Sequence, residues 1–306
     1  MASRDMRSGV FLTVLASLIW GTSFPGIKWG LGYVGNDIFF LWLRFLVASA
    51  VTLSVVVYLK KFSFSVMKEP VIWLIGGLNT VGFVLQYVGQ TYTTASKTSL
   101  LVDINVMAVA IVSYFAFRER LSRMQVGGVL LGTFGVVLVA SSSATTGNGV
   151  SFDSEELLGD VLVYVAGWSW AFFIVASKKT LARHSAIEIS SGAITVCMLL
   201  LIPAVAYLSM TGADFTIEPT GWLAVVYLGV LCTSAAILLW AMGLEGVSAT
   251  ASATIMLIEV VTALAISFSL LEETLSRPAI VGAVCVLAAI YLVASAPEEK
   301  TAVKAT

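Results

Sequence analysis

Ten apolar segments of about 20 residues recur along the 306-residue chain, with short polar connections between them. A helix of about 20 residues is long enough to span about 30 Å of hydrocarbon. Only 11% of the residues are charged, against roughly 25% in a soluble domain, which is too few to cover a fold of this size in water. We therefore predict an all-α polytopic membrane protein with ten transmembrane helices, at 9–31, 37–59, 71–90, 98–117, 123–141, 158–177, 187–209, 220–243, 248–271 and 278–296.

Positively charged residues are concentrated in every second connection. The segments on the N-terminal side of the membrane hold 13 of the 17 Lys and Arg residues, whereas the connections on the other side hold only Lys97 and Arg277. The acidic stretch around Glu155 and Glu156 falls on this second side. Because cytoplasmic loops are enriched in Lys and Arg, we predict that both termini are cytoplasmic. The expected location is the plasma membrane, which in a bacterium is the inner membrane.

An internal repeat relates the two halves of the chain. A shift of 154 residues places ERLSR, from Glu119, on ETLSR, from Glu273, and nine of the 23 pairs that begin there are identical. A shift of 150 pairs Trp20 with Trp170, so one copy contains about four additional residues. Each copy would hold five spans, and an odd number inserts the second copy with the opposite orientation.

This repeat predicts two inverted five-helix units around a central cavity. The expected divisions are a first repeat at 1–145, an external linker at 146–157, a second repeat at 158–296 and a cytoplasmic tail at 297–306.

Two copies of one motif carry a family resemblance. Each copy has an apolar helix, a turn containing Glu-x-Leu-Ser and a glycine-containing helix, and they stand as YFAFRERLSRMQVGG from Tyr114 and SFSLLEETLSRPAIVG from Ser267. The sequence WGTSF from Trp20 and the LRF around Arg44 also fit. On these motifs the chain resembles the EamA family of the drug/metabolite transporter superfamily over nearly its entire length.

The resemblance implies a basket of ten helices whose cavity is lined mainly by spans 3, 4, 8 and 9. Aromatic amino-acid exporters are among the characterised members that the chain is similar to. Members usually have a proline in the fourth and ninth spans, where this chain has Val106 and Val260. The residue that would break each of these helices is therefore missing here.

Polar side chains mark one face of the third span. Asn79, Phe83, Gln86 and Gln90 recur at intervals that put them on one side of a helix. Polar groups inside a membrane are energetically costly and normally face the bundle interior or a water-filled cavity. We predict that this face lines a substrate cavity, and hydrogen bonds that join helices are the alternative.

The fourth and ninth spans complete the predicted cavity with Ser99, Asn105 and Glu259. The 154-residue shift makes Asn105 and Glu259 equivalent, near the membrane midplane, where an inverted-repeat carrier holds its solute. Glu259 has no cationic residue at its own depth, so we interpret it as a candidate site for proton coupling.

Two charged residues occur at similar depth in neighbouring spans. Arg44 and Asp103 each lie about eight residues inside the outer end of a span, which predicts a buried ion pair. The alternatives are that Arg44 binds a substrate carboxylate and that Asp103 carries a proton. Lys28 and Lys97, near outer span ends, are expected to extend to the membrane surface as anchors.

Tryptophans fall inside or near spans rather than in two belts, among them Trp20, Trp168 and Trp240. We predict that these three help to line an aromatic cavity able to stack a planar or cationic solute. Anchoring at the membrane interface is the alternative.

The chain lacks the patterns of several other functional classes. There is no GxxxxGKS/T loop for nucleotide hydrolysis, and no catalytic or metal-binding group can be assembled around His184, the only histidine. A net charge of −1 gives no reason to expect a nucleic-acid partner. We therefore expect no cofactor and no metal.

The resulting prediction is a monomeric secondary transporter in the lipid bilayer. We expect it to export amino acids, aromatic ones among them, or related small metabolites by alternating access, either uncoupled or linked to protons. Exchange of sugar phosphates or nucleotide sugars is the alternative, and it would require two or more cations in the cavity. A channel and an intramembrane enzyme are the alternatives of another class.

Overall fold

The computed structural model describes residues 6–59, 66–117, 122–140, 154–256, 258–274 and 276–295. Its first half forms α1 (Met6–Leu31), α2 (Asp37–Tyr58), α3 (Pro70–Tyr92), α4 (Ala95–Val102), α5 (Ile104–Phe117) and α6 (Arg123–Ala140), with a short 3-10 turn η1 (Val66–Lys68). Its second half forms α7 (Ser154–Thr180), α8 (Ala186–Met210), α9 (Pro219–Tyr227), the π-helix η2 (Leu228–Ala235), α10 (Ala236–Leu244), α11 (Ala249–Ile255), α12 (Ile258–Leu270) and α13 (Arg277–Ser295).

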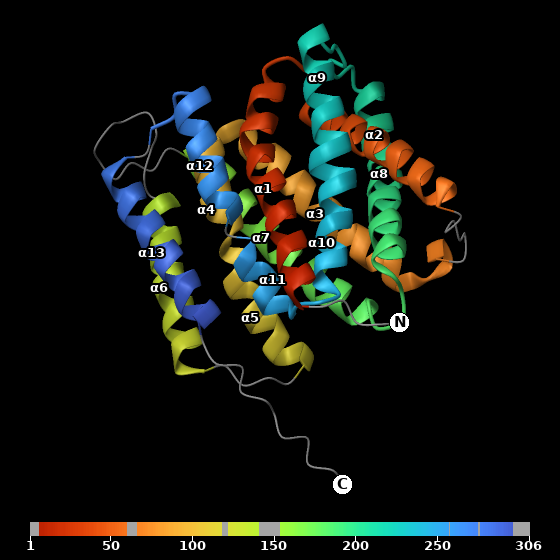
Figure 1. Cartoon of the computed structure of the whole chain (residues 1–306). Helices are drawn as coiled ribbons and strands as arrows, with labels where there is room; N and C mark the ends of the chain where they lie inside the picture. Colours follow the sequence, from red (N-terminus) through yellow and green to blue (C-terminus); the bar gives the residue numbers. More distant parts are fainter. Residues whose placement is uncertain are drawn as a thin grey trace.

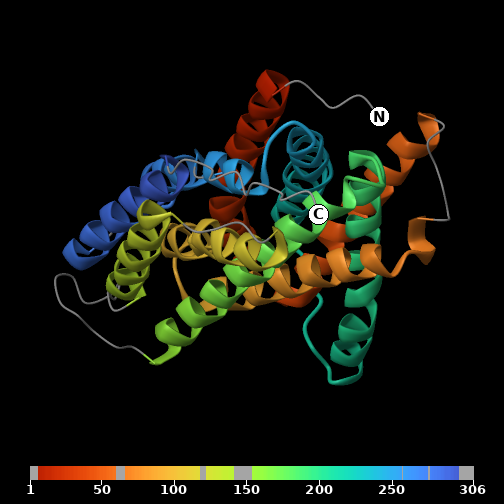
Figure 2. The same cartoon turned by 90° about the horizontal axis from the view of Figure 1, so that it is seen from below.

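These helices confirm the predicted fold class. In the described part of the chain, eight helical segments are long and apolar enough to cross a membrane, and three of them combine consecutive helices. Two shorter apolar helices, α6 and α13, pack against each other at one edge of the bundle (Figure 1, Figure 2). Together these ten segments follow the predicted order, so the chain is an all-α polytopic membrane protein.

The helix boundaries repeat with the predicted shift. The helices α4, α5 and α6 each begin 154 residues before α11, α12 and α13. The starts of α1 and α2 precede those of α7 and α8 by close to 150 residues. Each half therefore contains five spans, which is the arrangement of an inverted repeat.

The additional residues of the second half lie within its third span. The helix α3 has 23 residues, whereas its counterpart, Pro219–Leu244, has 26. The π-helix η2 inside this counterpart closes hydrogen bonds from residue i to i+5, so each turn holds more residues. The difference in length between the copies is therefore taken up within a continuous span.

The fourth span of the first half is divided without a proline. The division lies at Asp103, whose ψ of 2° departs from helical geometry, between α4 and α5. In the second half, α11 ends at Ile255, Met256 lies in a turn and α12 begins at Ile258. Val106 and Val260, at the places of the usual prolines, lie inside regular helices.

The predicted divisions of the chain fall partly outside the described residues. The linker at 146–157 is described only from Ser154 onward, where α7 has already begun, and the tail at 297–306 lies wholly outside. The proposed repeat boundaries of 1–145 and 158–296 therefore stay predictions.

Glycines permit close contact between the halves where α3 packs against α7. A Cβ atom on Gly159 would lie 2.7 Å from the carbonyl oxygen of Gly89, and one on Gly89 would lie 2.8 Å from that of Gly159. Real Cβ atoms do not approach main-chain oxygens this closely, so the contact needs glycine on both helices.

We expect Gly159→Ala to push α3 and α7 apart and to destabilise the protein by about 1–3 kcal/mol, the usual cost of overpacking. The measurement is thermal unfolding of the purified protein in detergent. Gly127→Ala is the matched control, because nothing lies within 4 Å of the added carbon there. Equal unfolding temperatures for the two variants would contradict the close contact.

Candidate functional site

An internal cavity lies where the two halves meet. Its empty volume is about 560 Å³, and this volume includes the part that is open to solvent. Its lining comes from α1, α2, α3, α4, α5, α7, α10 and α12 and from the end of α11. The lining residues are Trp20, Ser23, Phe24, Arg44, Asn79, Phe83, Gln86, Val102, Asn105, Trp170, Phe173, Ile174, Ile237, Trp240, Met256 and Glu259.

The cavity is built from equivalent positions of the two halves. Under the shifts of 150 and 154 residues, seven lining residues of the first half correspond to seven of the second. The pairs are Trp20 with Trp170, Ser23 with Phe173, Phe24 with Ile174, Phe83 with Ile237, Gln86 with Trp240, Val102 with Met256, and Asn105 with Glu259. Arg44 and Asn79 complete the lining without a counterpart on it. The repeat thus determines which positions line the cavity, and the paired side chains differ in chemistry.

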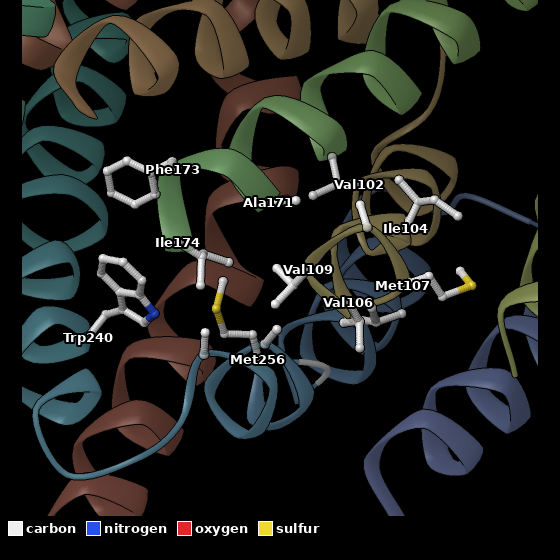
Figure 3. Close-up of a cluster of buried hydrophobic side chains, with 14 of the residues drawn as sticks. Val102, Ile104, Val106, Met107, Val109, Ala171, Phe173, Ile174, Trp240 and Met256 are labelled. Carbon is white, nitrogen blue, oxygen red and sulfur yellow. The ribbon is translucent and has the colours of Figure 1, made fainter. Parts of the chain in front are cut away.

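Aromatic rings form one wall of the cavity. The ring of Trp240 stacks on Phe173 with centroids 5.1 Å apart, and Trp20 is tilted against Trp240 at 6.2 Å. Each indole is fixed by a hydrogen bond, since Trp240 Nε1 donates to Ser252 Oγ at 3.0 Å and Trp20 Nε1 donates to the Cys232 carbonyl at 2.9 Å. Figure 3 shows Phe173 and Trp240 beside Ile174 and Met256. These rings form an apolar wall whose geometry is set by the indole hydrogen bonds and by the stacking of Phe173 on Trp240.

The predicted ion pair between Arg44 and Asp103 is not formed, and this expectation was wrong. Arg44 is fully buried and donates from Nε to Thr233 Oγ1 at 2.6 Å, and from its terminal nitrogens to Tyr87 Oη at 3.2 Å and the Cys232 carbonyl at 3.3 Å. Equal depth does not set the direction in which a side chain leaves its helix. Arg44 turns instead toward the π-helix, where Cys232 and Thr233 offer it two oxygens.

The Arg44 guanidinium also lies 4.7 Å from the centroid of the Phe83 ring. Its three hydrogen bonds use three of the five N–H groups of an arginine, which leaves two without a partner in the described chain. Arg44 is therefore a fixed positive charge on the cavity wall with remaining capacity to donate.

Two carboxyl groups meet at the helix breaks. Asp103 lies between α4 and α5, Glu259 lies in the first turn of α12, and the two carboxyl groups lie within electrostatic range of each other. Glu259 lines the cavity, whereas Asp103 lies behind the lining. Neither carboxylate oxygen of Asp103 has a hydrogen-bond partner within the described ranges. The break between the half-helices therefore holds a buried acidic pair, one group from each half.

Two amides on the lining have unsatisfied polar atoms. Asn79 Nδ2 and Asn105 Oδ1 are buried and have no hydrogen-bond partner among the described residues. A buried amide atom without a partner loses the hydrogen bonds that water would supply, which destabilises the empty protein. A bound solute that pairs with both atoms would recover this loss.

Three predicted cavity residues lie elsewhere. Gln90 donates from Nε2 to the Phe24 carbonyl at 2.7 Å, and Ser99 donates from Oγ to the Ser96 carbonyl at 2.9 Å, so both act within the helix packing. Trp168 packs against the core outside the lining. Its neighbour Trp170 lines the cavity instead, because two residues along a helix turn a side chain by roughly 200°. The structure places the other seven predicted substrate contacts on the lining.

Several lining residues were missed by the sequence analysis. Trp170 was signalled by the repeat, since it is the equivalent of Trp20. Phe173 and Ile174 follow from the same shift once Ser23 and Phe24 are known to line the cavity. No polarity or spacing in the second half alone distinguishes them from ordinary core residues.

Lys97 is not a surface anchor, because its side chain is only 2% exposed. Its ammonium group lies 2.6 Å from Asp160 Oδ2 and 2.9 Å from Glu156 Oε1, both on α7. Thr93 Oγ1 donates to Asp160 Oδ1 at 2.7 Å. These bonds join the α3–α4 corner of the first half to the start of α7 in the second.

Glu273 makes a second connection between the halves at the same corner. It follows α12, and its carboxylate accepts from the Ala95 and Ser96 main-chain N–H groups at 2.9 Å each and from Ser96 Oγ at 2.7 Å. A carboxylate at a helix N-terminus compensates unpaired N–H groups and the helix dipole. The loop after α12 thereby caps α4 of the other half.

Two equivalent lysines hold one corner in each half. Lys28 donates to the carbonyls of Gln90 and Thr93 at 2.9 and 2.8 Å. Lys178, its equivalent, donates to the carbonyls of Leu244 and Val247 at 2.7 and 2.6 Å. The carbonyls are themselves related by 154 residues. Each lysine therefore fastens the turn between the third and fourth spans to the first span of its own half.

Comparison with known proteins identifies a family. The profile of the EamA-like transporter family matches residues 7–141 and again residues 157–295. An uncharacterised transporter of Archaeoglobus fulgidus is 30% identical over 92% of this chain and 95% of its own length. The proteins named probable amino-acid metabolite efflux pump in Salmonella typhimurium and Escherichia coli are each 26% identical over 94% of both chains.

A solved structure has the same fold. A crystal structure of a protein aligns with 96% of this chain and 98% of its own, with a TM-score of 0.71 and 19% sequence identity. At this level of identity the likeness concerns the arrangement of helices.

We expect cysteines introduced singly at Asn79, Gln86 and Glu259 to react with a small hydrophilic thiol reagent, because these positions line the cavity. The background carries Cys285→Ser and keeps the two buried native cysteines. A cysteine at Gln90 is the control and should react several-fold more slowly. Labelling rates are measured by mass spectrometry, and equal rates at all four positions would contradict the assigned lining.

Proposed function

Because this chain belongs to the EamA-like transporter family, we propose that it is a secondary transporter that exports amino acids, aromatic ones among them, or related small metabolites. The observation that carries the proposal is the cavity between the halves, whose lining combines aromatic rings with Arg44, Asn79, Asn105 and Glu259. Solute pockets are mostly apolar with a few polar groups that fix orientation. The printed names of the Salmonella and Escherichia relatives support the same solute class.

Alternating access is the mechanism that we propose for the two halves. The bonds of Lys97 and Glu273 connect one half to the other at the corner that the charge pattern assigns to the outer side. The bonds of Lys28 and Lys178 stay within one half each. We therefore take each half as a unit that rocks against the other, with the outer connection closed in this conformation.

Protons are the proposed coupling ion. Asp103 and Glu259 come from different halves, and two ionised carboxylates at one buried site repel each other. The positive charge on the same lining, Arg44, donates to Thr233, Tyr87 and Cys232 instead of to either carboxylate. A proton bound by either carboxyl group relieves the repulsion, and its release to the other side can be linked to movement of the solute.

Exchange of phosphorylated sugars is less well supported. A phosphate group carries up to two negative charges and is usually bound by several cations. Among the described residues, the lining contains one cation, Arg44, and one acidic group, Glu259.

The relatives are transporters, which points away from an enzyme. We place the protein as a monomer in a bacterial inner membrane with both termini in the cytoplasm and without a nucleic-acid partner.

We expect proteoliposomes that contain the purified protein to move labelled phenylalanine, tryptophan or threonine, and an imposed pH gradient to accelerate this flux. Glu259→Gln should remove the response to the gradient, since it removes a carboxyl from the shared pair. Gly127→Ala is the control for reconstitution. Exchange of a sugar phosphate in the absence of amino-acid flux would overturn the proposal. An amino-acid flux that does not change with the imposed pH gradient would overturn proton coupling.

We expect Glu273→Gln to weaken the outer connection and to raise the population open to the outside by about tenfold, because hydrogen bonds to a charged acceptor contribute about 1.5–3 kcal/mol each. The measurement is labelling of a cysteine at Gln86 in intact cells with a reagent that does not cross membranes. Glu272→Gln changes the exposed neighbour in the same way and is the control. Equal labelling of both variants would contradict the closure.

A further inference from the structure

We propose that the cavity binds a zwitterionic α-amino acid in one orientation, with its ammonium group at Asn105 and Glu259 and its carboxylate at Asn79 and Arg44. This inference rests on the proposed function and adds to it the polarity of the site. It follows from the separation of donors and acceptors between two walls of the cavity.

The wall formed by the helix breaks is rich in acceptors. Asn105 Oδ1 is buried without a partner, and Asn105 lies two residues after the break that contains Asp103. Glu259 occupies the equivalent position in the other half and adds a carboxyl group that is 3% exposed. When one of the two groups is protonated, Asp103 and Glu259 together carry a single negative charge, which matches one ammonium group. An ammonium has three N–H donors and no acceptor, so it can bind both side chains.

The wall formed by α2 and α3 is rich in donors. Asn79 Nδ2 is buried without a partner, and Arg44 retains two N–H groups beyond its bonds to the π-helix and Tyr87. Phe83 lies one turn after Asn79, and the Arg44 guanidinium lies 4.7 Å from its ring centroid, which places the arginine along the same face of α3. A carboxylate has two oxygens and can accept from both residues.

The remaining surface of the cavity suits an apolar side chain. Trp20, Trp170, Phe173 and Trp240 supply aromatic surface. Indole hydrogen bonds hold Trp20 and Trp240, Phe173 stacks on Trp240, and Trp170 meets Phe83 edge-on. An aromatic or branched aliphatic substituent would contact these rings without an unpaired polar atom. The reversed orientation would place the carboxylate against Glu259 and the ammonium against Arg44, and both contacts are repulsive.

The test compares L-phenylalanine with two analogues, each of which lacks one of its two charged groups. They are L-phenylalanine, 2-phenylethylamine, which lacks the carboxylate, and 3-phenylpropionate, which lacks the ammonium. Binding to the purified wild type, Glu259→Gln and Asn79→Leu is measured by quenching of tryptophan fluorescence in detergent. Trp168→Phe, a substitution outside the lining, is the matched control, and thermal unfolding verifies that each variant is folded.

We expect a crossed pattern, with losses of about tenfold or more where a buried polar partner is removed. Glu259→Gln should weaken L-phenylalanine and 2-phenylethylamine and leave 3-phenylpropionate within about twofold. Asn79→Leu should weaken L-phenylalanine and 3-phenylpropionate and leave 2-phenylethylamine within about twofold. Trp168→Phe should match the wild type for all three ligands.

The opposite crossing, or an equal loss of all three ligands in both folded variants, would overturn the orientation. Uptake of L-phenylalanine by wild-type proteoliposomes separates this failure from failure of the proposed function. If the vesicles transport amino acids while the crossed pattern is absent, only the orientation is wrong. If they transport none of them, the proposed function falls and the orientation falls with it.

Discussion

A membrane leaves no water for a main-chain N–H or carbonyl group, so every interruption of a helix must provide its own partners. The interruptions in this chain coincide with the cavity. The π-helix in the eighth span offers the Cys232 carbonyl to both Trp20 and Arg44, which are themselves cavity residues. The breaks in the fourth and ninth spans are flanked by Asn105 and Glu259. Within the described spans, irregular backbone therefore lies beside the cavity, where side chains such as Trp20 and Arg44 bind it.

The inverted repeat explains the shape of the cavity but not its chemistry. Equivalent helices present equivalent positions, so seven residues that face the cavity in the first half have counterparts that face it in the second. The paired side chains have diverged, as when Gln86 is matched by Trp240 and Asn105 by Glu259. A symmetric scaffold with unequal side chains gives a solute two different walls. The polarity of the site therefore resides in a few substitutions between otherwise similar halves.

Hydropathy and charge were sufficient to predict the ten spans, their order and the odd parity of the repeat, because these depend on composition along the chain. It was harder to predict which face of a helix a given side chain occupies. Trp168 and Trp170 differ only in the face they occupy, and the depth of Arg44 gave no information on whether it points to Asp103 or to the π-helix. The division at Asp103 was hidden because proline is the usual signal, and here an aspartate lies at the end of α4 without it. Comparison of the two copies, position by position, would have found Trp170.

The bonds of Lys28 and Lys178 affect which substitutions the two corners can accept. Lys28 and Lys178 bind main-chain oxygens, which every residue type supplies, rather than the side chains of the corners they hold. A substitution at a corner residue therefore leaves the acceptor of the lysine in place, whereas a substitution of the lysine removes both bonds. The side chains of the two corners can differ between the halves while the attachment of each corner to its first span stays the same.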